Sequence, residues 1–206
     1  MELKSVGLLD VRAAAAQRRS IRAYEPVPIP REDLEEILDV VRLAPSAFNV
    51  QPWRFVVVET PELKGRLAEA ANQQRQVHSA PVVIVLYTDM EDALENVDEM
   101  LHPGMDAAQR AAVRETILRV FGGQSVEERA AWAAGQGYIA LGYLLLAAES
   151  HGYQTSPMTG FNAEAVKALL GLPASARIPA IVAIGRGSEE GFPAHRHELE
   201  RILRVA

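Results

Sequence analysis

The stretch from Trp132 to Ala148 constrains the fold most, because it is a helical pattern that is apolar on almost every face. The pattern begins near Ser125 or Val126, and Gly152 ends it in the manner of a helix C-terminus. A helix that is apolar all round is buried. We therefore expect it to lie at the centre of the molecule, packed either within one chain or between two chains.

Strand candidates lie among the helical patterns without strict alternation. The run from Val82 to Tyr87 is continuous and β-branched, which is typical of a strand buried on both faces. Because strands and helices do not alternate regularly, the sequence predicts an α+β fold. The four candidate strands are 55–59, 82–87, 153–155 and 178–185.

The 206 residues are most simply organised as one domain, 1–206, with a helical excursion. The excursion runs from about 90 to 121. It is charged and helical, is interrupted near His102-Pro103-Gly104, and is placed to cover a site. Other helices are expected at about 6–17, 31–44, 61–71, 163–170 and 196–205.

Composition excludes several function classes. A net charge of −6 and a pI near 5.4 argue against nucleic-acid binding, which needs a positive face. The absence of cysteine excludes disulfides and thiolate metal sites. His195 and His197 do not share a helix face and have no evident third ligand, so we expect no metal site. No glycine-rich dinucleotide motif or phosphate-binding P-loop motif occurs.

The N-terminus lacks the charged and apolar regions of a signal peptide. The longest apolar run, Tyr138 to Ala148, is shorter than the roughly 20 residues that span a bilayer. We therefore expect a soluble cytoplasmic protein with no membrane partner.

Two polar segments near the front of the chain carry the functional signal. The first is Arg18-Arg19-Ser20-Ile21-Arg22, whose guanidinium groups suit phosphate oxygens. The second is the loop Pro45-Ser46-Ala47-Phe48-Asn49-Val50-Gln51, which leads through Pro52-Trp53 into a strand. A solvated helix end and a self-satisfied turn are the simpler interpretations. Together the segments suit a phosphorylated, planar, hydrogen-bonding cofactor.

In this order the two segments resemble the nitroreductase family of FMN-dependent oxidoreductases. The family opens with Arg-x-Ser-x-Arg/Lys and continues with Pro-Ser-x-x-Asn-x-Gln-Pro-Trp. The resemblance extends along almost the whole chain. It implies a mixed central sheet wrapped by helices, and an intertwined homodimer with FMN at the interface.

The resemblance implies roles for individual residues. Arg18 and Ser20 would contact the FMN phosphate and ribityl chain, Arg19 would contribute mainly its backbone, and Arg22 would lie near the pyrimidine side of the flavin. The loop would cover the flavin of the partner subunit. Its lining residues would be Pro45, Ser46, Asn49 and Gln51.

Further along the chain, Asn72 and Arg75 would face the flavin pyrimidine ring. The segment Pro157-Met158-Thr159-Gly160 would follow the flavin, with a backbone N–H directed at flavin N5. Many members have Glu where this chain has Thr159. Arg196 would hold the phosphate, while the Lys that some members have two residues earlier is Ala194 here. Arg186 is a weaker candidate.

The resemblance also implies the chemistry. We expect two electrons to pass from NADH or NADPH to nitroaromatic or quinone-type acceptors by a ping-pong mechanism. No catalytic side chain is expected, because the flavin carries the reaction. Arg22 and Arg75 would stabilise the negative charge that reduction leaves on the flavin. Alternatives are enone reduction, dehalogenation or flavin destruction on the same fold, and a non-catalytic FMN-binding protein.

Overall fold

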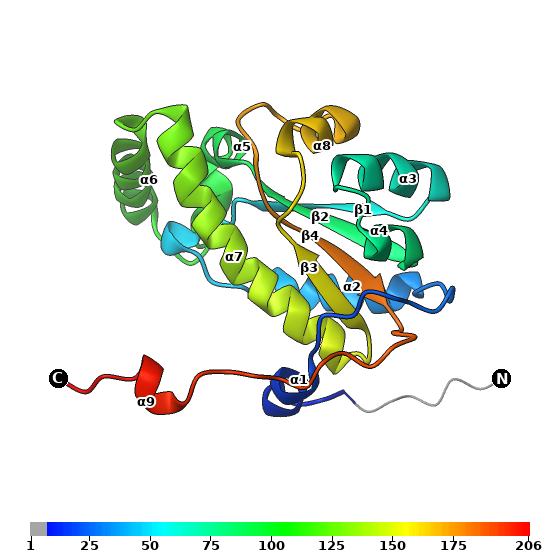
Figure 1. Cartoon of the computed structure of the whole chain (residues 1–206). Coiled ribbons are helices and arrows are strands. Elements are labelled where there is room, and N and C mark those ends of the chain that lie inside the picture. Colours follow the sequence, from blue (N-terminus) through cyan, green and yellow to red (C-terminus); the bar gives the residue numbers. More distant parts are fainter. Residues whose placement is uncertain (1–7) are drawn as a thin grey trace.

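The computed structural model describes residues 8–206, and its architecture is a central sheet with helices on both faces (Figure 1). The strand order is β1-β2-β4-β3, and every neighbouring pair is antiparallel. Among the described residues, the parallel component expected of a mixed sheet is one bridge between Ser20 and Thr155. The predicted α+β class is confirmed. The strands are β1 Trp53–Val58, β2 Val82–Thr88, β3 Gln154–Met158 and β4 Arg177–Gly185.

Helices surround the sheet in the described part of the chain. Two short 3₁₀ turns, η1 Ala47–Asn49 and η2 Val97–Met100, lie between them. The helices are α1 Val11–Gln17, α2 Arg31–Val41, α3 Pro61–Ala70, α4 Arg75–Ser79, α5 Met90–Glu95, α6 Ala107–Gly122, α7 Val126–Ser150, α8 Ala163–Leu170 and α9 Leu199–Ile202.

Side-chain alternation along β2 divides the core into two layers. Val82, Ile84 and Leu86 pack with residues of α2 and α7. Val83 and Val85 point to the opposite face and pack with residues of α3, α4 and α8. Because successive strand residues face opposite sides, a strand covered on both faces must be apolar throughout. This confirms the prediction that the run is a doubly buried strand.

Helix α7 crosses one face of the sheet, with a capping box formed by Ser125 and Glu128 at its start. A Cβ atom on Gly137 would lie 2.7 Å from Pro179 Cγ and 2.8 Å from Thr88 Cγ2. The helix backbone therefore approaches β2 and β4 as closely as it can. α7 is long and apolar enough to cross a membrane, but core helices of soluble proteins meet the same criterion.

The opposite face of α7 is not covered by residues 8–206, the part of the chain that the structure describes. Tyr138 is 52% exposed, and Ile139 and Tyr143 are also exposed. No atom other than those of its own helix backbone and chain neighbours would lie within 4 Å of a Cβ on Gly135 or Gly142. The prediction that this helix is buried is therefore met within one chain on one face only.

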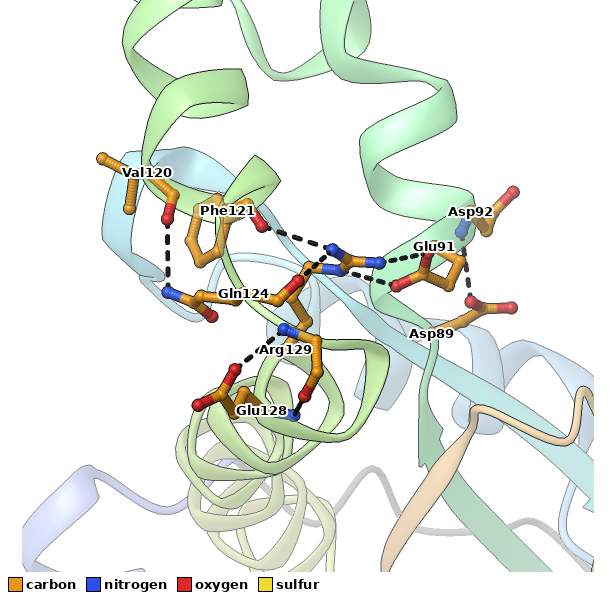
Figure 2. Close-up of polar contacts among 9 residues, drawn as sticks. Asp89, Glu91, Asp92, Val120, Phe121, Gln124, Glu128 and Arg129 are labelled. Carbon is orange, nitrogen blue, oxygen red and sulfur yellow. Dashed lines mark hydrogen bonds and ion pairs between the residues drawn. The ribbon is translucent and has the colours of Figure 1, made fainter.

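The segment 90–121 is helical, as predicted, and is built from α5, η2 and α6. Figure 2 shows how Arg129 of α7 fixes it. The Arg129 side chain pairs with Glu91 and also donates to the carbonyls of Phe121 and Gln124 at 3.3 and 2.7 Å. A cluster of apolar side chains, including Ile117 and Phe121, packs beneath the excursion.

Three helix predictions differ from the structure. α1 begins at Val11, because the Asp10 side chain caps it by accepting from the N–H of Ala13 at 2.7 Å; the first part of the predicted 6–17 helix lies outside the described residues. Arg75 begins the short helix α4, which was not predicted. The predicted 196–205 helix is limited to α9, on a tail that leaves the body of the molecule (Figure 1).

Candidate functional site

The segment that follows α1 lies between the edge strand β3 and the chain that follows β4. The N–H of Ile21 donates to the carbonyl of Thr155 at 3.1 Å, beside the bridge from Ser20 to the same residue. Tyr24 forms an antiparallel bridge with Gly187. The structure thus brings the Arg18–Arg22 segment beside the strand that contains Pro157 and Met158.

The guanidinium of the half-buried Arg18 has one nitrogen that is buried and unsatisfied. It is the C-terminal cap residue of α1, and its Nη1 atom is buried with no hydrogen-bond partner among the described residues. Burial lowers its pKa, as do the positive charges of Arg196 and Arg19, while Glu149 opposes the shift. The exposed Arg196, from the far end of the sequence, thus adds positive charge at Arg18.

The Arg19 guanidinium is bonded to backbone carbonyls beside Arg18. Its Nη1 donates to the carbonyls of Ala16 and Arg18 at 2.7 and 2.8 Å. Its Cβ would be 2.7 Å from a Cβ on Gly191, so the chain after β4 packs directly on it. A role for Arg19 through its backbone agrees with this side-chain orientation.

Two buried polar groups beside the cations lack partners. Glu149 of α7 is 5% exposed, and its Oε2 has no hydrogen-bond partner among the described residues. Burial raises the pKa of Glu149, and the charges of Arg18 and Arg19 oppose that rise. Thr155 is fully buried and its Oγ1 is also unsatisfied. Such groups normally find partners in folded proteins, so both leave hydrogen-bonding capacity unused here.

Arg22 and Arg75 meet at one carboxylate. The backbone N–H of Arg22 donates to Glu189 Oε1 at 2.7 Å, and Arg75 Nη2 pairs with Glu189 Oε2 at 3.0 Å. Arg75 Nε also donates to the carbonyl of Arg22 at 3.1 Å. The Arg75 side chain therefore lies against the backbone of Arg22, and the positive charge that the resemblance implies for Arg75 is ion-paired with Glu189.

Asn72 and Gln74 converge on Gly160. Both side-chain amides donate to its carbonyl oxygen at 2.9 Å. Asn72 and Gln73 have φ of 55°, a left-handed conformation that is uncommon for non-glycine residues. A Cβ on Gly160 would meet only Gln74 Nε2, at 3.9 Å, so open space lies over this backbone. Thr159 is exposed beside it.

The loop from 45 to 51 forms a separate polar unit. Ser46 Oγ accepts from the N–H of Gln51 at 2.9 Å, and Gln51 Nε2 donates to Asn49 Oδ1 at 3.0 Å. Phe48, Asn49 and Gln51 have φ of 55°, 57° and 44°. Pro45 is exposed at the start of the loop. Three left-handed residues so close together mark a backbone that its surroundings over-determine.

This loop contacts the helical excursion. Asn49 Nδ2 donates to the carbonyl of Met100 at 3.1 Å, and the rings of Phe48 and Phe121 are 6.1 Å apart. Figure 1 shows the loop, in pale blue, beside α6 and far across α7 from α4. Within one chain, the Pro45–Gln51 residues are therefore not brought to the Arg18–Arg22 segment.

A cavity of about 430 Å³ lies between the loop and the excursion. Arg54, near its wall, forms an ion pair with Asp92 at 2.5 Å. Polar side chains (Gln51, Arg54, Asn96 and Glu99) and apolar ones (Val50, Trp53, Ala93 and Met100) line the cavity together.

Arg186 points to a different neighbour. Its guanidinium lies 5.8 Å from the centre of the Tyr153 ring, a cation–π distance. Burial, together with a hydrogen bond to Asp33, raises the pKa of Tyr153 to about 12.

Sequence reasoning missed three residues of this region: Gln74, Glu149 and Glu189. Gln74 lies inside a polar stretch that the sequence did single out. Glu149 interrupts an otherwise apolar helix end, and a lone acid there is a usable signal. Glu189 has no local signal, because only the pairing of the chain after β4 with Arg19–Tyr24 brings it to the site.

Comparisons with known proteins agree on one family. The family model described as "Nitroreductase family" matches residues 15–186. A Thermus thermophilus protein named NADH dehydrogenase is 52% identical over 95% of this chain and 96% of its own length. An oxygen-insensitive NAD(P)H nitroreductase of Salmonella typhimurium is 31% identical over 95% of this chain and 99% of its own.

A solved structure agrees as well. A protein of Exiguobacterium sibiricum, assigned as a nitroreductase and crystallised with FMN, has a TM-score of 0.89 and 26% identity. The match covers 98% of this chain and all of that chain.

Proposed function

The chain belongs to the nitroreductase family, and from this premise we propose that it is an FMN-dependent oxidoreductase that uses NADH or NADPH. We propose nitroaromatic or quinone-type compounds as electron acceptors, reduced in a ping-pong cycle. The observation that carries the proposal is the buried, unpartnered Nη1 of Arg18 among further cations. The FMN-bound structure supports the choice of cofactor.

The residues of the first segment fit a phosphate. A phosphomonoester carries about −1.5 to −2 charges at pH 7 and has three acceptor oxygens. Arg18 offers an unused buried donor, and Arg196 and Arg19 add positive charge. In this proposal Arg18 and Arg196 hold the phosphate, and Ser20 contacts the ribityl chain.

The residues around Gly160 fit the ring. The open space over the Gly160 backbone leaves room for a flat group to approach the main chain. Asn72 combines donor and acceptor groups, which match a neighbouring carbonyl and N–H. In this proposal Asn72, Arg75 and Arg22 flank the pyrimidine side, and Pro157, Met158, Thr159 and Gly160 lie along the ring.

We propose that the functional unit is a homodimer. The uncovered face of α7 and the apolar tail, in which Phe192 and Val205 are each 88% exposed, are surfaces that a second copy would bury. In such a dimer Pro45, Ser46, Asn49 and Gln51 would reach the partner's cofactor. The excursion, which the loop contacts, would then help to line the substrate channel.

FMN, when bound, supplies the redox chemistry, and the protein supplies binding, orientation and electrostatics. In this proposal Arg22 and Arg75 place positive charge beside the flavin ring, where reduction leaves negative charge. This favours the reduced flavin. No side-chain acid is required, because water can deliver the proton to the product.

An absorbance spectrum of the purified protein, taken anaerobically before and after NADH and then NADPH, tests this function. A flavin spectrum that bleaches with either donor and recovers with a quinone or nitroaromatic supports the reductase. A flavin spectrum that persists would favour a specialised enzyme of the same fold or a binding protein. No flavin after reconstitution with FMN would overturn the proposal.

A further inference from the structure

Glu189 joins two parts of the site that are far apart in sequence. One of its oxygens accepts from the backbone N–H of Arg22, and the other pairs with the guanidinium of Arg75. The third contact, from Arg75 Nε to the Arg22 carbonyl, closes the ring of interactions. No recognised motif of the sequence contains this carboxylate.

The backbone around Glu189 holds it in place. The N–H of Ser188 donates to the carbonyl of Ala23 at 3.0 Å, and the N–H of Gly187 donates to Gln154 Oε1 at 2.8 Å. Gly191 packs on Arg19. The Glu189 side chain is 35% exposed, so its charge is only partly screened by water. The neighbouring Glu190 is exposed and has no ion pair among the described residues.

We propose that Glu189 sets how easily the bound flavin is reduced. It does so by offsetting the positive charge of Arg75, one of the two arginines beside the flavin. The inference rests on the proposed function, in which Arg22 and Arg75 flank the flavin ring. Hydride transfer from the nicotinamide oxidises the donor and adds two electrons and one proton to the ring, hence one negative charge. A nearby carboxylate opposes that charge, so Glu189 holds the reduction potential below the value that the two arginines alone would give.

Arg75 does not depend on Glu189 alone for its position. Its Nε bond to the Arg22 carbonyl remains when the carboxylate is neutralised. In Glu189→Gln the side-chain oxygen can still accept from Arg22 or Arg75, while the negative charge is lost. The variant therefore isolates charge from geometry.

The experiment measures the two-electron potential of the FMN-loaded protein by equilibration with a reference dye, together with FMN affinity. We expect Glu189→Gln to shift the reduction equilibrium about tenfold toward the reduced state, or about 30 mV for a two-electron couple. Glu189→Ala should shift it in the same direction. Glu190→Gln is the matched control and should leave the potential unchanged.

The outcomes are distinguishable. If Glu189 had a purely structural role, Glu189→Gln would keep the wild-type reduction potential and only the alanine variant would be impaired. This result would overturn the inference. An equal or lower potential in Glu189→Gln, with FMN bound and reducible in the wild type, would also overturn it. A wild-type protein that binds no FMN would instead overturn the proposed function, and the inference with it.

Discussion

Arg129 of α7 and Glu91 of α5 form a two-pronged ion pair, with Nε–Oε1 and Nη2–Oε2 distances that are both 2.8 Å (Figure 2). The Arg129 side chain is 13% exposed and that of Glu91 34%. Bidentate pairing of this kind fixes the relative orientation of the two groups. The pair therefore ties the start of the excursion to the helix that supports the sheet.

Breaking this pair should loosen the excursion. We expect Arg129→Gln to cost about 3 kcal/mol, because it leaves a partly buried carboxylate without its partner. The melting temperature should fall by roughly 6–12 °C, and the KM for quinones should change more than the FMN content. Thermal unfolding and steady-state kinetics provide the measurements.

The control is Asp98→Asn at the exposed, 3.5 Å Arg114–Asp98 pair, which should change stability by less than about 1 kcal/mol. Equal losses of stability in the two variants would contradict the role of the Arg129–Glu91 pair in holding the excursion.

Arg18 should act through the cofactor's phosphate. We expect Arg18→Gln to weaken FMN binding about tenfold to a hundredfold, as for loss of a hydrogen bond to a charged group. Riboflavin, which lacks the phosphate, should lose little affinity. Fluorescence titration of both ligands measures the difference, and Arg12→Gln on the exposed part of α1 is the control. If both ligands weakened equally, the phosphate assignment would be wrong.

Arg22→Ala should make the flavin harder to reduce. Removal of one positive charge beside the ring destabilises the reduced state, so the potential should fall by about 30 mV or more. FMN affinity should decrease as well. Dye equilibration gives the potential and titration gives the affinity. If neither changes, Arg22 does not lie where the proposal puts it.

Glu149 should make stability depend on pH. Because burial raises its pKa in the folded state above the ordinary 4.5, the folded protein holds the proton more tightly than the unfolded chain. Its contribution is therefore most favourable below pH 4.5 and is lost as pH rises through the raised pKa. We expect Glu149→Gln to stabilise the FMN-free protein by about 1 kcal/mol at neutral pH, with the gain disappearing in acid. Thermal unfolding over a pH series checks this, and a gain that is independent of pH would contradict it.

Local patterns were sufficient for most of the fold. Apolar and polar residues do not alternate in Val82–Leu86, because α2 and α3 cover opposite faces of that strand. The continuous apolar run therefore indicates burial on both faces. Within the described residues the start of α1 was predicted less well, because the capping contact of Asp10 begins the helix at Val11, after Leu8 and Leu9. The predicted C-terminal helix, 196–205, is limited to the single turn of α9, since none of its residues is buried against the rest of the described chain.

The proximity of candidate residues was predictable where polar side chains are concentrated in short segments. Arg18–Arg22 and Asn72–Arg75 are such segments, and the structure places Arg22 beside Arg75. The ion pair of Arg75 with Glu189 was not predictable, because it depends on the register between two segments far apart in the chain. Nor could the sequence alone have decided between packing of α7 within one chain and the proposed packing of its exposed face on a second copy.

Tyr138 provides the test of that assignment. It is 52% exposed in one chain, and it lies between Gly135 and Gly142, whose surroundings are open. If a second copy covers this face, Tyr138→Glu buries a charge at the interface, and the homodimer should dissociate. FMN should be lost with it, because the Pro45–Gln51 loop would no longer reach the partner's site. Analytical ultracentrifugation and bound-flavin absorbance measure the two effects. Val40→Glu, at a 40% exposed position on α2, is the control and should remain dimeric with FMN bound. A Tyr138→Glu protein that stays dimeric and yellow would place the interface elsewhere, since no self-association through this face of α7 could accommodate the added charge without loss.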